Sequence, residues 1–139
     1  MDKKIIITIP HYNNPVGLIN TISSINDPIK IDIVITDDGS EIKLDEHQVR
    51  SKYNNKGNIH FIYLDKNYGV GIAANKCLEY VKNKSYKYVA RLDAGDISYK
   101  NKFSKQIEFL EKNNQIMLVG TWARVLDNEG NLLSLIHIS

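Results

Sequence analysis

Residues 86–96 read Tyr-Lys-Tyr-Val-Ala-Arg-Leu-Asp-Ala-Gly-Asp, a β-branched and aromatic run that ends abruptly in acids. The composition of the run predicts a strand from Tyr86 to Leu92, which places Asp93 and Asp96 at its carboxyl end. In open α/β sheets, ligands bind at this end of the strands. Two carboxylates three residues apart on a tight turn suit a hard cation, and such a cation in turn suits a diphosphate.

A second strand-like run has the same kind of ending. Residues 31–36, Ile-Asp-Ile-Val-Ile-Thr, are followed by Asp37, Asp38, Gly39 and Ser40. Aspartates at a strand end can accept hydrogen bonds from a base N–H or a ribose hydroxyl, although the same residues also build ordinary turns and helix caps. Two acid clusters at strand ends in one short chain favour a site for a nucleoside diphosphate.

Strand-like and helix-like segments alternate along the chain, which predicts an α/β fold with a mostly parallel sheet flanked by helices. Strands are expected at residues 5–9, 31–36, 59–64 and 86–92. Helices are expected at residues 15–25, 44–53, 69–82 and 101–113, and a last ordered piece at 117–126 is followed by a turn at 127–130.

The composition narrows the class of protein. The 139 residues suffice for one domain with its own core, and 42% hydrophobic and 24% charged residues argue against disorder and against a membrane protein. A net charge of only +2 argues against a nucleic-acid partner. The single cysteine, Cys77, excludes an internal disulfide and a cysteine-based zinc site. With no apolar run of membrane-spanning length, the expected location is the cytoplasm.

Two loops complete the set of candidate binding segments. Pro10, Tyr12 and Asn13 follow the first strand, where Tyr12 offers a flat face for a base and Asn13 offers an amide; a capped loop without further function is the alternative. Residues 67–76 combine small residues with a helix start, which attracts phosphate, although close helix packing would explain them too. This segment matches neither the dinucleotide fingerprint nor the Walker pattern.

Charged residues near these loops are further candidates. Lys76 is the best placed cation for a phosphate, and Arg91 can pair with Asp93 or Asp96 or reach a phosphate. The four histidines show no metal-ligand spacing and are interpreted as non-ligands.

The order of these elements resembles family 2 glycosyltransferases of the GT-A fold. The resemblance rests on strand–Pro-x-Tyr-Asn, strand–Asp-Asp-Gly-Ser, Asn-x-Gly before a helix, and strand–Asp-Ala-x-Asp, and it covers about residues 4 to 132. The stretches 90–98, 105–111 and 119–122 are similar to bacterial members that build surface polysaccharides.

Site residues carry over from the family position by position. The resemblance implies nucleotide contacts from Pro10, Tyr12, Asn13, Asp37, Asp38, Asn67, Gly69, Asn75, Lys76, Arg91 and Asp93. It also implies a divalent cation, Mn²⁺ or Mg²⁺, held by Asp93 and Asp96. The family motif normally reads Asp-Ala-Asp-Asp, and Gly95 stands where the third residue, the usual metal ligand, would be.

The resemblance further implies an activity. It is the transfer of a hexose from a nucleoside-diphosphate sugar, a UDP-sugar above all, to a glycan or lipid-linked acceptor in surface polysaccharide synthesis, with inversion, at the inner face of the membrane. Because family members continue well past this point, we expect residues 1–132 to be the donor-nucleotide half, inactive alone, with the general base beyond the chain. Residues 133–139 read like a translated cloning adapter, so we expect a non-native tail; a final native strand is the alternative.

Two other functions compete with this interpretation. The chain can be a complete, non-catalytic nucleotide-binding module. A phosphorylated receiver domain also carries paired acids, but it needs them after its first strand and a phospho-accepting aspartate after the third, where Asp65 is the only candidate.

Overall fold

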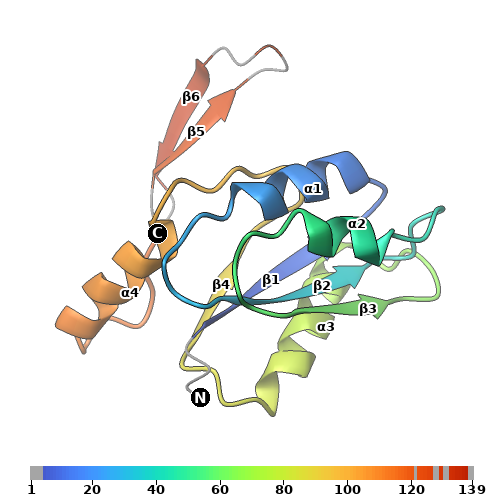
Figure 1. The fold of residues 1–139 in the computed structure, drawn as a ribbon. Coiled ribbons are helices and arrows are strands. Elements are labelled where there is room, and N and C mark those ends of the chain that lie inside the picture. Colours follow the sequence, from blue (N-terminus) through green and yellow to red (C-terminus); the bar gives the residue numbers. More distant parts are fainter. Residues whose placement is uncertain (1–4, 121, 127–128, 130–131, 138–139) are drawn as a thin grey trace. The chain divides into compact units, whose positions relative to one another are not determined.

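A parallel four-stranded sheet lies at the centre of the larger of two compact units, Met1–Lys102 and Phe103–Ser139 (Figure 1). The computed structural model describes residues 5–120, 122–126, 129 and 132–137. Its strands are β1 (Ile5–His11), β2 (Asp32–Asp37), β3 (Ile59–Tyr63) and β4 (Tyr88–Arg91), in the order β3-β2-β1-β4, and every neighbouring pair is parallel.

The two central strands form the core. Every residue of β1 and β2 is buried, which explains why Ile5–Ile9, interrupted only by Thr8, and Ile33–Ile35 read as apolar runs rather than as an alternation. β1 continues to His11, two residues past the predicted end, because Pro10 and His11 still pair with β2. β4 is shorter than predicted because its pairing with β1 runs only from Tyr88 to Arg91.

Helices cover both faces of this sheet. α1 (Pro15–Ser24) and α2 (Glu46–Ser51) lie on one face and α3 (Val70–Lys82) on the other (Figure 1). Asn14 caps α1 through a bond from the Gly17 N–H, with Pro15 at the first helical position as predicted. The chain steps outward from β1 to β2 and β3 and then crosses back to β4, so the strand order reverses between β1 and β4. Such a reversal is where open α/β sheets bind their ligands.

The second unit is described by itself. It contains all but the first residue of α4 (Lys102–Lys112), and β5 (Trp122–Leu126) pairs antiparallel with β6 (Leu132–His137). The ordered piece expected at 117–126 is therefore a strand only from Trp122. The turn expected at 127–130 lies outside the described residues except for Glu129.

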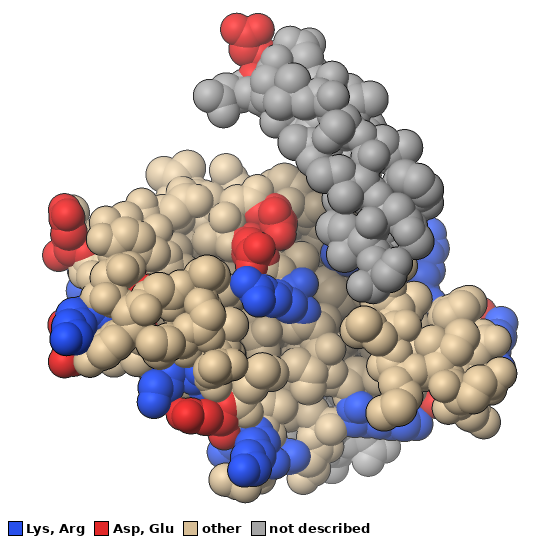
Figure 2. Space-filling view, turned by 180° about the vertical axis from the view of Figure 1, so that it is seen from behind, with Lys and Arg blue, Asp and Glu red and all other residues tan. Residues whose placement is uncertain are grey.

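Surface charge and helix length bear on the expected partners. On the face shown in Figure 2, basic and acidic side chains are interspersed rather than gathered into one basic stripe. Among the described residues, no helix combines the length and the apolar character needed to cross a membrane.

Candidate functional site

A cavity of about 190 Å³ lies where β1 and β2 end and α3 begins. Its lining residues are Pro10, His11, Tyr12, Asp38, Asn67, Gly69, Val70 and Ala73. Cavities for drug-sized ligands start at about 300 Å³. The cavity therefore suits a single ring system, with the rest of a larger ligand outside it.

One side of the cavity offers an aromatic face and small apolar groups. Tyr12 is 46% exposed and Val70 is 61% exposed, whereas Ala73 is fully buried. A tyrosine ring held at a cavity mouth is a stacking surface for a planar ligand. The expectation that Tyr12 lies against a base stays a prediction.

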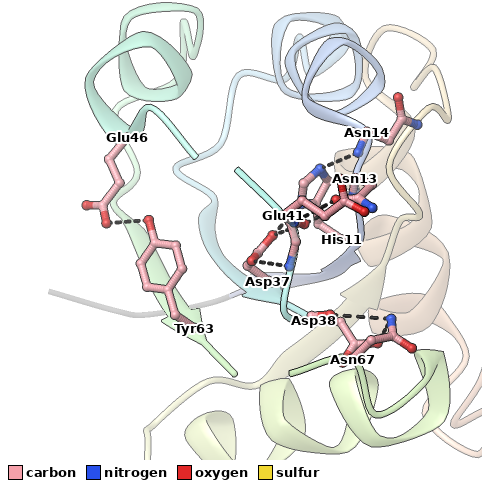
Figure 3. Close-up of polar contacts among 10 residues, drawn as sticks. His11, Asn13, Asn14, Asp37, Asp38, Glu41, Glu46, Tyr63 and Asn67 are labelled. Atoms are coloured by element: carbon pink, nitrogen blue, oxygen red, sulfur yellow. Dashed lines mark hydrogen bonds and ion pairs between the residues drawn. The ribbon is translucent and has the colours of Figure 1, made fainter. Parts of the chain in front are cut away.

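Asp38 holds the start of α3 in place beside the cavity. Its Oδ1 accepts the Tyr68 N–H at 2.8 Å, and its Oδ2 accepts the Gly69 N–H at 2.9 Å. Oδ2 also accepts the Asn67 side-chain amide at 3.1 Å (Figure 3). These bonds supply the cap that Gly69 cannot provide and place a negative charge at the positive end of α3. A carboxylate has about four acceptor positions, so one remains for a ligand.

The turn after β2 requires a glycine. Gly39 has a φ of +67°, and a Cβ at this position would lie 2.2 Å from the carbonyl carbon of Lys66. Only a residue without a side chain allows this close approach between the end of β2 and the segment before α3. Gly39 therefore helps to set the distance between the cavity walls.

Asp37 plays a different part from its neighbour. Its Oδ1 accepts hydrogen bonds from His11 Nδ1 at 2.8 Å and from the Ser40 hydroxyl at 2.6 Å, and its Oδ2 accepts the Ser40 N–H at 3.1 Å (Figure 3). Asp37 is 3% exposed and does not line the cavity. The structure thus uses Asp37 to hold the loops, whereas the sequence suggested a nucleotide contact.

Asn13 likewise belongs to the loop framework. Its N–H donates to the Ser40 hydroxyl and its Oδ1 accepts the Glu41 N–H, both at 2.9 Å. Its φ of +47° is left-handed, a conformation that asparagine tolerates better than most residues. Asn13 shapes the loop on either side of Tyr12 but does not line the cavity.

The acids after β4 form a separate exposed turn. Arg91 Nε donates to Asp93 Oδ1 at 3.1 Å, as one of the predicted pairings, and Asp96 Oδ2 accepts the Asp93 N–H at 3.0 Å. The Gly95 N–H donates to the buried Thr21 hydroxyl of α1, which anchors the turn. Burial lowers the pKa of the nearby Lys102 ammonium, and the Asp96 carboxylate opposes that shift.

The expectation that Asp93 and Asp96 hold a divalent cation stays a prediction. Within the described residues, no three histidine, cysteine or acidic side chains are grouped so as to hold a metal ion. The contacts above engage one oxygen each of Asp93 and Asp96. Two carboxylates fit a cation such as Mg²⁺ that takes its other ligands from phosphate and water.

The remaining predicted residues lie away from the cavity. Lys76 pairs with Glu79 at 3.3 Å on α3, and the neighbouring Asn75 is exposed. Conversely, sequence reasoning missed three lining residues, His11, Val70 and Ala73. Val70 and Ala73 are three residues apart in the first turn of α3, and this helical spacing could have identified them. No sequence signal distinguishes His11 from a histidine without function.

Comparison with known proteins identifies the family of this chain. The family model described as "Glycosyl transferase family 2" matches residues 6–137. The chain belongs to this family. A glycosyltransferase of unknown specificity from Methanocaldococcus jannaschii is 31% identical over 139 residues, covering 96% of this chain and 46% of the relative. TuaG of Bacillus subtilis, named for teichuronic acid biosynthesis, is 34% identical over 104 residues, covering 73% of this chain and 39% of TuaG.

Solved structures show the fold of this family 2 member. Residues 1–349 of S. aureus TarS in complex with UDP-GlcNAc superimpose with a TM-score of 0.64 at 22% identity, covering 86% of this chain and 33% of the TarS chain. The predicted α/β architecture of the GT-A type is thereby confirmed. The chain spans about half the length of the M. jannaschii relative and less of the others.

Proposed function

We propose that this chain binds the nucleotide of a UDP-sugar in the cavity between Tyr12 and Asp38. The protein to which it belongs then transfers the sugar, a hexose, with inversion to a glycan or lipid-linked acceptor of a surface polysaccharide, on the cytoplasmic side of the membrane. The observation that carries this proposal is a ring-sized cavity at the carboxyl ends of β1 and β2, lined by the aromatic face of Tyr12 and by the carboxylate of Asp38. The UDP and UDP-GlcNAc complexes of TarS support it.

The base is recognised by stacking and by one hydrogen bond. The half-exposed Tyr12 ring stacks on the base, a contact that tolerates any base. The remaining acceptor position of Asp38 takes the ring N–H that uracil presents. A cavity of about 190 Å³ accommodates one base.

The diphosphate extends from the cavity toward the acid turn after β4. Asp93 and Asp96 would hold Mg²⁺ or Mn²⁺, and the cation would supply positive charge to stabilise the departing nucleoside diphosphate. Arg91 would add positive charge at this turn, and Lys76 would have to leave Glu79 to reach a phosphate. Gly95 has a φ of +104° and no side chain, so Asp93 and Asp96 are the two side chains of this turn that would bind the cation.

Transfer also needs a general base for the acceptor hydroxyl. Three donors already surround the carboxylate of Asp37 and three surround that of Asp38, which leaves neither suited to take a proton from an acceptor. We therefore assign the base to a part of the protein outside residues 1–139, and we expect this chain alone to bind the donor without turnover.

A nucleotide panel tests the proposal. In isothermal titration with Mn²⁺, UDP binds more tightly than ADP, NAD or free phosphate. Tyr12→Ala weakens UDP binding about tenfold or more, because base–aromatic stacking contributes about 1–3 kcal/mol. Tyr99→Ala, which removes another exposed tyrosine outside the cavity, leaves UDP binding unchanged. Equal, negligible affinity for the whole panel in a folded sample would overturn the proposal.

A further inference from the structure

We propose that His11 is a positioning residue. Its imidazole ring, held as one neutral tautomer, orders the base site before a ligand binds. Its ring ties the loop that carries Tyr12 to the end of β2. The inference rests on the proposed function only for the identity of the ligand, because the hydrogen bonds that carry it exist within the free chain.

Two hydrogen bonds fix the proton on the ring. The Asn14 N–H donates to His11 Nε2 at 3.0 Å, so Nε2 must accept and carries no hydrogen. The proton then sits on Nδ1, which lies 2.8 Å from Asp37 Oδ1. The His11 side chain is 1% exposed and that of Asp37 is 5% exposed, so water does not compete for either bond.

The same contacts bracket Tyr12 on both sides. Before it, the His11 ring is bonded to Asp37, and after it, Asn13 is bonded through the Ser40 hydroxyl to the same Asp37 oxygen (Figure 3). A backbone hydrogen bond also joins the ends of β1 and β2, because the Asp38 N–H donates to the His11 carbonyl at 2.8 Å. A loop ordered before the ligand arrives loses less entropy on binding.

Neither charged histidine nor an apolar residue satisfies this arrangement. A protonated Nε2 would point an N–H at the Asn14 N–H, and a leucine would leave the Asn14 N–H and one Asp37 bond without partners. Two polar replacements separate the two bonds of the ring. Asparagine can donate from the position of Nδ1, and glutamine can accept at the position of Nε2.

The test compares these replacements in the 139-residue chain by NMR and by UDP titration. In the wild type without nucleotide, long-range ¹H–¹⁵N spectra show His11 neutral with its proton on Nδ1. We expect each replacement to loosen the amides of residues 12–14 and to weaken UDP binding about tenfold, the equivalent of one hydrogen bond. His11→Asn loses the bond from the Asn14 N–H, and His11→Gln loses the bond to Asp37. His47→Asn, at an exposed position, changes neither readout.

The outcomes separate the two proposals. A proton on Nε2, or loop order in either variant equal to that of the wild type, overturns the positioning role of His11. UDP affinity that merely follows thermal stability across the three His11 proteins overturns it as well. If the wild type shows the Nδ1–H tautomer and the expected loop order but binds no nucleotide, the proposed function fails and the positioning of the loop stands.

Discussion

Two adjacent aspartates after β2 carry the same sequence signal and do different work. Both were predicted to contact a nucleotide, yet Asp37 accepts hydrogen bonds from His11 and Ser40, while Asp38 lines the cavity. Residue type and spacing predicted that carboxylates gather here. The hydrogen-bond partners of the two carboxylates include His11 and Gly69, which lie 26 and 31 positions away along the chain. The sequence alone could not assign different roles to Asp37 and Asp38, because it does not show which of these distant residues each carboxylate meets.

Replacing Asp37 should affect stability first. Asp37→Asn turns one acceptor oxygen into a donor that faces the donors of His11 and Ser40, and we expect a loss of about 2–3 kcal/mol in the free energy of unfolding. Urea denaturation measures it, with the exposed Asp65→Asn as the matched control. A loss no larger than that of the control would show that the Asp37 network contributes little.

Cys77 should be chemically silent in the folded chain. It is fully buried against the Thr36 hydroxyl at 3.1 Å, and burial raises the pKa of its thiol. Because only the thiolate reacts, iodoacetamide at pH 8 should label the native chain slowly and the urea-unfolded chain rapidly. Equal labelling rates for the two states would contradict the buried position.

At the scale of elements, the sequence predicted the features that depend on local signals, namely the periodicity of apolar residues and the helix caps. α3 begins at Val70 and ends at Lys82 as expected, and Asn14 with Pro15 marks the start of α1. Strand ends were less predictable, because β4 is limited by the length of its pairing with β1 rather than by its own composition. The cap of α3 was not predictable either, since it comes from Asp38 on another element.

Gly39 and Gly71 differ in whether the structure requires a glycine at that position. Gly39→Ala forces a side chain into the left-handed turn and against Lys66, so we expect a loss of about 2–3 kcal/mol and weaker UDP binding. Gly71→Ala, in α3, meets nothing within 4 Å and should stabilise the chain by about 0.5–1 kcal/mol. Thermal denaturation of both variants checks the pair, and equal effects of the same sign would contradict the account of the β2 turn.

At the scale of the whole molecule, the alternation of segments predicted a parallel α/β sheet, and the family match confirms the resemblance. The cavity itself could not be predicted, because it depends on how closely the loops after β1 and β2 approach the start of α3. The expectation that residues 133–139 are non-native stays a prediction. Residues up to His137 form part of β6, and the DNA of the source locus beyond the codon for Leu132 decides the question.

Asp93 in the turn after β4 should contribute more to UDP binding when a divalent cation is present. Asp93→Asn removes a negative charge from the proposed cation site, so it should weaken UDP binding more in Mn²⁺ than in EDTA. Titrations in the two buffers measure the difference, with the exposed Glu108→Gln, which lies on α4, as the control. An identical loss in both buffers would show that Asp93 does not act through a metal ion.

The most direct measurement maps UDP onto the chain by ¹H–¹⁵N chemical shifts in the presence of Mg²⁺. The account predicts the largest shifts at Tyr12, Asp38, Gly69 and Ala73, around the cavity between the ends of β1 and β2 and the start of α3. Shifts confined to the opposite ends of these strands, near Asp32 and His60, or no shifts at all, would contradict it.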